Sequence, residues 1–416
     1  MDLLINYILW LVFTLVWVMA LSFVSRGRHK QLPPGPKPYP VIGNLLELGA
    51  KPHKSLTKLA KVHGPIMSLR LGLVITVVVS SPSMNKAILQ NHDLSFCDRK
   101  VPEAVLSLPF PHHEFSLAWL PVSTMWKNLR KISNMHIFGQ AEDNCRAETG
   151  KPNLSDHFPL LKKFDLQGIK CRITVYSMLE VFDRLVDQRL KHRQECGCSI
   201  STECKDILDT LLNIIQDKSD LFIAGNDTTS STMEWAMTKL LHNPKALLKA
   251  QLELEQTVGK CNPIEESDIT RLPYLQVVVK ETLRLHPAAP LLLPGKATKD
   301  VEIVGFTVPK GAQVFVNVWA IGRDESTWDN PHTFIPERFF GSNADFKGQH
   351  FELIPLGVGR RICPGLPLAI RMLHLMLGSL INSFDWKLDH HNMDMEDKFG
   401  LTVQKAQPFH AVLVAI

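Results

Sequence analysis

The N-terminal part of the chain contains an uncharged run long enough to cross a membrane. Residues 3–24, LLINYILWLVFTLVWVMALSFV, match the roughly 20 apolar residues that a bilayer-spanning helix needs. A cleaved secretory signal usually has only about 7–15 apolar residues, and no small-residue cleavage site follows this run. The next residues, 25–30, are basic, which by the positive-inside rule keeps them in the cytosol. The sequence therefore predicts an uncleaved membrane anchor with a basic flank in residues 1–30; a buried core helix is the alternative.

Composition limits the classes of protein that the rest of the chain can form. The chain has 416 residues, of which 45% are hydrophobic, enough apolar material for one large core. Its net charge of +5 is too small to indicate nucleic-acid binding, but it suits an acidic protein partner or an anionic lipid surface. Eight cysteines in this length do not make a disulfide scaffold, so we expect mostly reduced thiols in the cytosol.

Proline and β-branched residues indicate how the body is organised. Residues 31–44 include LPPGPKPYP, where proline excludes a helix interior, so we expect a stiff hinge. Two hairpins are predicted, one turning at Leu71–Gly72 and one at 309–311 within FTVPKGAQVFVNV. A short helix should begin at Ser81–Pro82, with the serine as its cap. Elsewhere helical patterns end at prolines, as in LPYLQVVVKETLRLHP, so residues 45–416 are expected to form one mainly α domain with small β-sheets.

A single cysteine lies in the loop PLGVGRRICPG, with no second cysteine near enough for a Cys-x-x-Cys pair. The residues after Cys363 are apolar nearly all round, which indicates a buried helix, and Pro364 suits its first position. Cys363 would then lie at or beside the N-cap, where the helix dipole and unpaired N–H groups favour the thiolate. The glycines allow close approach to a large flat ligand, and Arg360 and Arg361 suit carboxylates. These features together indicate haem with the thiolate on its iron; a buried, inert cysteine is the alternative.

A second unusual segment is DLFIAGNDTTSSTMEW, residues 220–235. Its flanks predict a helix, but its centre consists of poor helix formers. Threonine hydroxyls there can bond to the carbonyl four residues earlier and open a local bend. Such a bend suits oxygen held over a metal, with Asp227 and Thr228 passing protons to it. An ordinary polar helix face is the alternative.

These motifs, in this order and over nearly the whole chain, resemble those of cytochromes P450 of the microsomal plant type. The family's loop Phe-x-x-Gly-x-Arg-x-Cys-x-Gly is matched at Gly359, Arg361, Cys363 and Gly365, with Leu356 in place of the phenylalanine. The resemblance implies the cytochrome P450 fold, mainly α with small β-sheets and preceded by a single N-terminal transmembrane helix. It also implies haem b, with Cys363 as the axial thiolate ligand of the iron.

The same resemblance assigns roles to residues elsewhere in the chain. TMWKNLRKI matches the family's Trp-x-x-x-Arg helix, so Trp126 and Arg130 are expected to meet a haem propionate. The distal helix of the family implies a catalytic role for Asp227 and Thr228. KETLRLHP and FIPERF imply a structural salt-bridge network of Glu281, Arg284 and Arg338. Positions that match the family's substrate-recognition segments give candidates for an apolar substrate pocket: Ala224, Leu291, Leu292, Phe399 and Leu401.

The amino-acid sequence from LLLPGKATKD to FIPERF most resembles the geraniol 8-hydroxylase-like subfamily of plant terpenoid hydroxylases. This resemblance implies hydroxylation of a small lipophilic substrate such as a monoterpenol, with O2 and with electrons from NADPH through NADPH–cytochrome P450 reductase. It also implies a single-pass protein of the endoplasmic reticulum membrane with a cytosolic catalytic domain and no nucleic-acid partner.

The sequence departs from the family pattern in two respects. Gly295 stands where the family usually has arginine or histidine for a propionate. The chain is also short, and apparent internal deletions near 139–151 and 215–221 remove helices and about two turns of the distal helix. Both deletions would fall where substrate is enclosed. A truncated, catalytically impaired or inactive membrane-bound remnant is therefore the alternative hypothesis.

Overall fold

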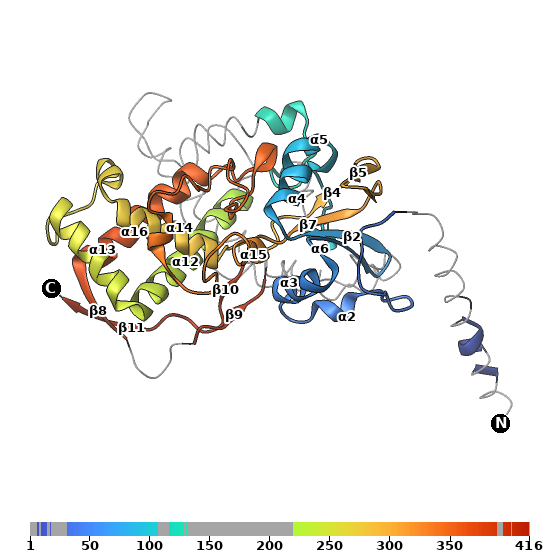
Figure 1. Cartoon of the computed structure of the whole chain (residues 1–416), viewed down its shortest axis with the longest axis horizontal. Coiled ribbons are helices and arrows are strands. Elements are labelled where there is room, and N and C mark those ends of the chain that lie inside the picture. Colours follow the sequence, from blue (N-terminus) through green and yellow to red (C-terminus); the bar gives the residue numbers. More distant parts are fainter. Residues whose placement is uncertain are drawn as a thin grey trace, which may run out of the picture.

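The computed structural model describes residues 31–106, 116–128, 130, 219–388, 394–400 and 402–415, together with residues 6, 7, 10–14 and 17. Long helices gather in one half of the molecule, and a mixed sheet with short helices forms the other half (Figure 1). The chain enters through the sheet, builds most of the helical half, returns to the sheet, and ends in the helical half. Because of this path, segments far apart in sequence meet at the junction of the two halves.

The helices of the described residues are α2 (Leu45–Leu48), α3 (Pro52–His63), α4 (Pro82–Lys86), the π-helix η2 (Ala87–Asn91), α5 (Asp93–Phe96), α6 (Glu103–Leu106), α12 (Ser219–His242), α13 (Pro244–Thr257), the 3-10 helix η5 (Glu266–Arg271), α14 (Pro273–Leu285), α15 (Val318–Ile321), the 3-10 helices η6 (Pro336–Phe339) and η7 (Gly359–Arg361), and α16 (Leu366–Ser383). The strands are β1 (Ile66–Leu71), β2 (Val74–Val79), β3 (Asp98–Arg99), β4 (Gly295–Lys296), β5 (Val301–Ile303), β6 (Phe306–Val308), β7 (Gln313–Val316), β8 (Phe384–Leu388), β9 (Asp397–Lys398), β10 (Gln404–Lys405) and β11 (Ala411–Ala415).

The main sheet has the strand order β1-β2-β7-β4-β3. Its first two strands form the hairpin predicted at Leu71–Gly72, and Gly72 takes a left-handed φ of 60° at the turn. β2 is flanked by β1 and by the parallel strand β7, so Val77, Val78 and Val79 are fully buried. The next helix, α4, begins at Pro82, and the Ser81 hydroxyl accepts a hydrogen bond from the Met84 backbone N–H, as the sequence predicted.

The prediction of a second hairpin, turning at 309–311, is wrong. β6 pairs with β5, and the turn lies at Val304–Gly305, where both residues have positive φ. β7 instead pairs with β2 and β4 in the main sheet. The Pro309–Gly311 segment therefore connects two different sheets. Sequence pattern marked a turn correctly but could not show that the strands on its two sides have partners elsewhere.

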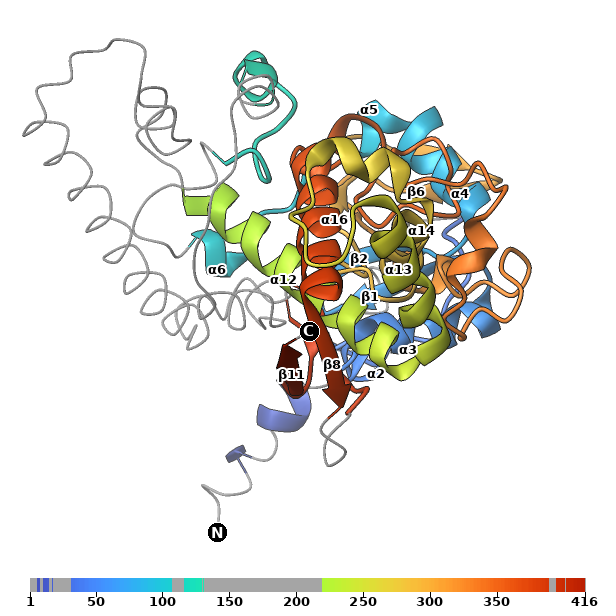
Figure 2. The same ribbon diagram turned by 90° about the vertical axis from the view of Figure 1, so that its left-hand side faces the viewer.

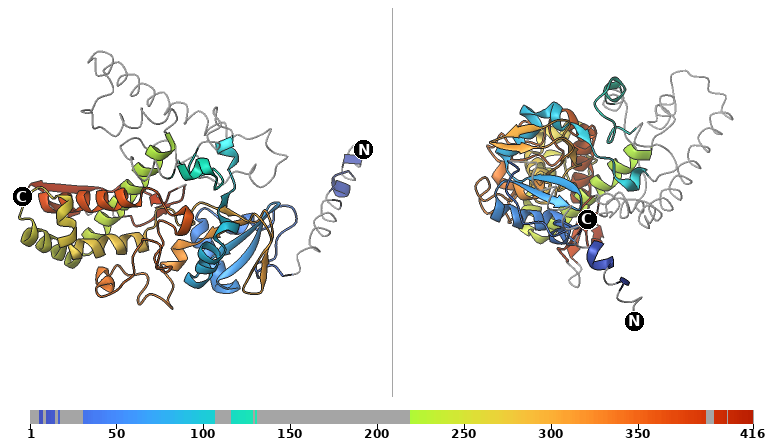
Figure 3. Two further views of the ribbon diagram at one scale, coloured as in Figure 1. Left: turned by 90° about the horizontal axis from the view of Figure 1, so that it is seen from above. Right: turned by 90° about the vertical axis from the view of Figure 1, so that its right-hand side faces the viewer.

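The helical half is built on α12, α13, α14 and α16, which share one apolar core. α12 ends at His242, directly before Asn243 and Pro244, and α14 ends one residue before the His286–Pro287 pair, as the proline positions predicted. α12 and α16 lie side by side, and the C-terminal hairpin of β8 and β11 closes this end of the molecule (Figures 2 and 3).

α16 differs in two details from the helix predicted after Cys363. Its N-cap is Gly365, so Pro364 precedes the helix and is not its first residue. The helix is buried on one face only, because Met372 and Met376 are 37% and 40% exposed. Within the described residues, α16 is also the one helix long and apolar enough to cross a membrane, but it packs against α12, α13 and α14 and belongs to the core.

Most of the predicted N-terminal anchor lies outside the described residues. Of residues 3–24, the structure describes 6, 7, 10–14 and 17, which are helical, and it leaves Trp10, Phe13 and Trp17 more than 60% exposed. The proline-rich stretch that follows the anchor bonds to β1: Ser68 donates through its hydroxyl to the Pro33 carbonyl and through its backbone N–H to the Pro34 carbonyl.

A buried ionic network joins α14 to η6. Glu281 and Arg284 have fully buried side chains, and the arginine donates to both carboxylate oxygens at 2.7 and 2.8 Å. Arg338 donates through Nε to Glu281 Oε1 at 3.1 Å, and the Ile335 backbone N–H donates to the same oxygen at 2.8 Å. The remaining N–H groups of Arg284 reach the carbonyls of Gly322, Pro331 and Thr333. The carboxylate of Glu281 and the guanidinium of Arg284 are thus both hydrogen-bonded at all their polar atoms within the described residues.

Removing one partner of this network should destabilise the protein strongly. Glu281→Ala leaves Arg284 buried without its counter-charge, and we expect a loss of about 3–5 kcal/mol in unfolding free energy. Glu266→Ala is the matched control, because Glu266 pairs with Arg371 on the surface at 3.3 Å and should contribute under about 1 kcal/mol. Urea unfolding followed by tryptophan fluorescence measures both. Equal effects of the two substitutions would contradict the structural role of Glu281.

Candidate active site

The loop before α16 holds Cys363 in a conformation that its glycines make possible. Gly357 and Gly359 have φ of +75° and +68°, values that side chains other than glycine rarely adopt. A Cβ on Gly359 would also lie 2.9 Å from the Leu89 carbonyl oxygen, so this glycine permits close packing against η2. The Cys363 backbone N–H donates to the Leu356 carbonyl at 2.9 Å, which fixes the cysteine at the end of the loop.

The surroundings of the Cys363 thiol act on its protonation in opposite directions. Burial raises the pKa of the thiol above its ordinary value. The backbone N–H groups of Gly365 and Leu366, at the start of α16, donate to the sulfur and lower the pKa, as does the positive charge of Arg130. Burial is the largest of these effects, so the N-terminus of the helix does not lower the pKa of the free thiol on balance. A cation bound to the sulfur would supply the missing stabilisation of the thiolate.

Three of the predicted cofactor-binding residues meet beside this loop. The Trp126 ring is buried, with the guanidinium carbons of Arg361 and Arg130 over it at 4.8 and 5.8 Å. Trp126 donates its indole N–H to the Leu117 carbonyl at 3.0 Å. Arg361 donates to the carbonyls of Cys97, Leu117 and Leu120, which uses three of its five N–H groups. Arg360 points elsewhere and pairs with Asp93 on the surface at 2.5 Å.

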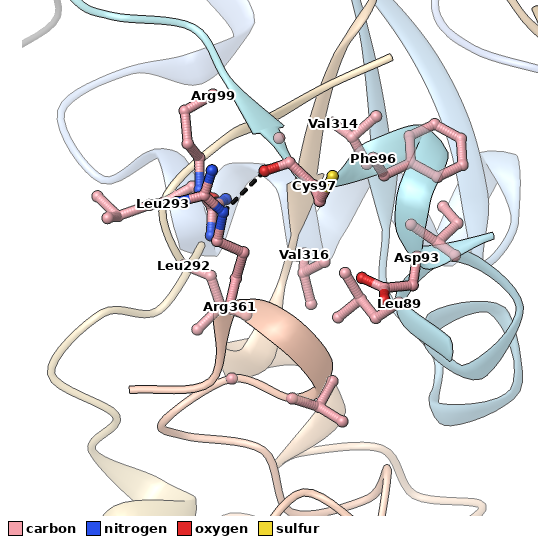
Figure 4. A pocket seen from close by; sticks show the side chains of 14 residues that line it. Leu89, Asp93, Phe96, Cys97, Arg99, Leu292, Leu293, Val314, Val316 and Arg361 are labelled. Atoms are coloured by element: carbon pink, nitrogen blue, oxygen red, sulfur yellow. Dashed lines mark hydrogen bonds between the residues drawn. The ribbon is translucent and has the colours of Figure 1, made fainter. Parts of the chain in front are cut away.

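A further arginine, which the sequence analysis missed, lies next to Arg361. The two guanidinium groups lie beside each other in a pocket that Leu292, Leu293 and Gly357 also line (Figure 4). Arg99 donates through Nη1 to the Leu293 carbonyl, but its buried Nε has no hydrogen-bond partner. Burial, and secondly the positive charge of Arg361, lowers the pKa of Arg99 to about 10. Two neighbouring cations are thus partly buried here, and the structure shows no salt bridge to either of them within the described residues. Burial is the largest effect on the pKa of Arg361 and lowers it, although Asp98 and Asp93 lie near enough to raise it.

The register of the sheet explains the departure at Gly295. β3 pairs with β4 so that Arg99 lies directly opposite Gly295, and side chains at such positions project from the same face. A Cβ on Gly295 would lie 3.0 Å from the Phe96 carbonyl oxygen, so a larger residue would be crowded there. The register thus places the positive charge of Arg99 on the strand next to position 295.

These residues fit a haem group. Cys363 offers a sulfur ligand for iron, and the buried Nε of Arg99 with the spare N–H groups of Arg361 offers donors for carboxylates such as the propionates. The buried N–H of Arg99 Nε costs free energy until an acceptor such as a carboxylate bonds it. The arrangement therefore favours a ligand that carries carboxylates at its edge and a metal at its centre.

The predicted distal residues lie on α12, which runs as one helix through the run of poor helix formers. Thr229 and Thr232 donate their hydroxyls to the carbonyls of Gly225 and Thr228, both at 2.7 Å, as the sequence predicted for threonines of this segment. Asp227 is 1% exposed, and Gln404 of β10 donates to its carboxylate at 3.5 Å. The carboxylate is thus held inside the protein by an amide from a distant segment.

The predicted substrate-pocket residues do not gather around one described cavity. Leu291 is buried in an apolar cluster against which Phe399 also packs. Leu292 belongs to another cluster and lines the pocket of Arg99 and Arg361. Ala224 lies on α12, where only the backbone is described, and Leu401 lies outside the described residues. The regions of the two predicted deletions, 139–151 and 215–221, also lie largely outside them.

Comparison with known proteins agrees with this geometry. The family model of cytochrome P450 matches residues 33–150 and 147–412. The chain therefore belongs to the cytochrome P450 family, and it is a haem-thiolate monooxygenase.

Curated relatives extend over almost the whole chain. Geraniol 8-hydroxylase of Catharanthus roseus is 45% identical over an alignment of 494 residues, which covers 98% of this chain and 99% of the relative. Geraniol 8-hydroxylase of Swertia mussotii is 44% identical, with 96% and 97% covered, and drimenol monooxygenase of Persicaria hydropiper is 41% identical, with 95% of each covered. Since this chain has 416 residues, it is internally shorter than these relatives.

If Arg99 neutralises a carboxylate of the cofactor, its removal should loosen haem. We expect Arg99→Met to release haem roughly tenfold to a hundredfold faster, because a buried charge-assisted hydrogen bond is lost. Arg360→Met is the matched control, since Arg360 pairs with Asp93 on the surface. Haem transfer to excess apomyoglobin, followed by absorbance, measures the release. Equal release rates of the two variants would contradict the assignment of Arg99.

Proposed function

We propose that this haem-thiolate monooxygenase hydroxylates a small terpenoid alcohol, with geraniol as the first candidate substrate. The observation that carries the proposal is the combination of the Cys363 loop with two partly buried arginines at one edge of the site, one of which has a buried Nε without a partner. The substrate class rests on the relatives that are named for geraniol and drimenol and align along the whole chain. The apolar cluster of Leu291 and Phe399 is consistent with a lipophilic substrate.

In this proposal each part of the site has a separate task. Haem, when bound, supplies oxygen activation and the oxidation of a C–H bond. Cys363 holds the iron, and Arg99 with Arg361 and Arg130 holds the propionate edge. Asp227 and the Thr228 hydroxyl pass protons from the protein interior to the reacting oxygen. Gln404 keeps the Asp227 carboxylate in place through its amide.

The N-terminal sequence and membership of the family support a proposal for the remaining partners. We propose that residues 1–30 anchor the chain in the endoplasmic reticulum membrane as a single span and leave the catalytic domain in the cytosol. Two electrons per turnover come from NADPH through NADPH–cytochrome P450 reductase. The N-terminal run and the lipophilic substrate are compatible, because such substrates concentrate in membranes.

A second candidate is an impaired or inactive remnant of the same enzyme. Two observations favour it: the family model matches in two pieces that meet at residues 147–150, and the alignments are longer than the chain. We propose internal deletions near 139–151 and 215–221, on the side that encloses substrate. Poor enclosure admits water and misplaces the reacting carbon, so electrons would be consumed without product.

Turnover of geraniol separates the two candidates. Membranes that contain the chain and a plant reductase should consume NADPH and release hydroxylated geraniol, but with little product per NADPH. Insertion of the corresponding segments of the Catharanthus roseus relative at the two proposed deletions should raise this ratio. Thr228→Ala should then lower it about tenfold or more at unchanged haem content, whereas Ser230→Ala, an exposed residue of the same helix, should not.

The outcomes are distinct. Well-coupled hydroxylation by the chain as it stands would contradict the remnant hypothesis. No product from any terpenoid alcohol, even after insertion of both segments, would contradict the proposed function. An unchanged ratio in Thr228→Ala would assign the polar run of α12 to packing alone.

A further inference from the structure

The small hairpin of β9 and β10 lies between the two halves of the molecule (Figure 1). Asp397 pairs with Lys405 and Lys398 pairs with Gln404, so the loop between the strands spans residues 399–403. Phe399, one of the substrate-pocket candidates from the sequence, begins this loop. The hairpin is attached to α3 on one side and to α12 on the other.

On the α3 side the attachment is a buried carboxylate. The Asp397 side chain is 2% exposed and receives three donors: Lys54 Nζ at 2.5 Å, His53 Nε2 at 2.8 Å and Lys51 Nζ at 2.9 Å. These donors outweigh burial and hold the pKa of Asp397 far below its ordinary value. All three come from the first turn of α3 or the residue before it. The aspartate therefore fixes the start of the hairpin to that helix.

His53 contacts both Asp397 and Phe399. The carboxylate bonds the edge of the imidazole and the phenyl ring lies on its face, so both act on the same side chain. The imidazole and phenyl rings are stacked, with centroids 5.4 Å apart and planes at 20°. Because a carboxylate only accepts, Nε2 must carry the proton in the bond to Asp397. Asn317 donates to the His53 carbonyl at 3.2 Å, and the Trp319 ring packs edge-on at 4.7 Å, so the histidine is itself held firmly.

On the α12 side the attachment uses one face of the helix. Asp227, Ser231 and Trp235 are four residues apart and so lie above one another on that face. Each contacts one residue of the segment 403–405, which contains β10 and the residue before it. Gln404 donates to Asp227, Ser231 donates to the Val403 carbonyl at 2.8 Å, and the Lys405 Nζ lies 5.3 Å from the Trp235 ring centre. The hairpin that carries Phe399 is therefore bonded to α12, the helix of Asp227 and Thr228, as well as to α3.

We propose that His53 is a positioning residue that sets the placement of Phe399 and thereby which carbon of the substrate is hydroxylated. The inference rests on the proposed function for the substrate class, and it adds that Phe399, one of the predicted substrate-pocket residues, contacts the substrate. The imidazole is buried between Asp397, Phe399 and Trp319, so we assign it no direct contact with the substrate. It acts by holding the phenyl ring through stacking and the hairpin through Asp397. Removal of either contact should let Phe399 move and the substrate rotate.

Two substitutions test the hydrogen bond between His53 and Asp397 from its two ends. His53→Phe keeps a ring against Phe399 but removes the donor to Asp397, whereas Asp397→Asn keeps His53 and weakens the same bond from the other side. Lys61→Ala is the matched control on α3, because Lys61 pairs with Glu325 in solvent and lies outside the cluster. Haem content and thermal midpoint show that each variant is folded. The readout is the ratio of geraniol hydroxylation products, which loss of folded enzyme would not change, measured in the form with the two segments inserted.

Both variants should shift the product ratio roughly tenfold, since displacements of about 1 Å are enough to change reaction rates strongly, and raise the KM for geraniol more than they lower kcat. Lys61→Ala should match the parent. Unchanged ratio and KM in folded His53→Phe and Asp397→Asn would overturn the proposal.

If the parent oxidises no terpenoid alcohol, the proposed function fails on its own, and hydrogen exchange decides the role of His53. Amides of residues 398–403 should then exchange about tenfold faster in both variants than in the parent or Lys61→Ala, because one charge-assisted hydrogen bond is lost. Equal exchange in all four proteins would overturn the positioning role as well.

Discussion

The buried carboxylate of Glu281 is the contact on which the position of the cysteine loop depends. It accepts hydrogen bonds from two arginines and one backbone N–H, and so ties α14 to the segment that starts η6. α14 also packs against α16, the helix that begins just after Cys363. The carbonyls that Arg284 reaches include Gly322, where a Cβ would lie 2.4 Å from the Arg284 carbonyl oxygen and leave no room for another residue. The network therefore stabilises the packing of α14 and η6, and we assign it no catalytic role.

The structure describes the two sides of the site to different extents. At the cysteine, backbone donors, glycine turns and a row of arginines are all in place. Burial and the positive charge of Arg361 lower the pKa of Arg99, and the buried Nε of Arg99 has no partner, so a carboxylate beside it would be favoured. On the α12 side, Asp227 and its neighbours are bonded to the β9–β10 hairpin, but the chain is shorter than its relatives. The shorter chain is the basis of the proposed loss of coupling.

Local rules predicted the local features well. The β1–β2 hairpin, the Ser81 cap, the ends of α12 and α14 before proline, and the threonine bonds within α12 all follow from backbone chemistry within a few residues. The features that sequence pattern missed are long-range. β6 pairs with β5 and not with β7, and the start of α16 is delayed by the turns that hold Cys363.

The candidate site shows the same limit. A family pattern pointed to Cys363, Arg361 and Trp126, and the structure brings them together. Nothing in the sequence separates Arg99 from its neighbour Lys100; only the pairing of β3 with β4 places that arginine opposite Gly295. Likewise His53 and Asp397 are 344 residues apart, and their bond became visible only in three dimensions.

The central claim is that Cys363 provides a thiolate to haem iron in a protein whose distal side is shortened. A carbon-monoxide difference spectrum of the reduced, membrane-expressed chain tests this most directly, because the band position reports the ligand opposite carbon monoxide. The account predicts the band of thiolate-ligated haem in the chain as it stands, and its loss in Cys363→Ser. Absence of any haem band in the folded protein, or the same thiolate-type band in Cys363→Ser, would contradict it.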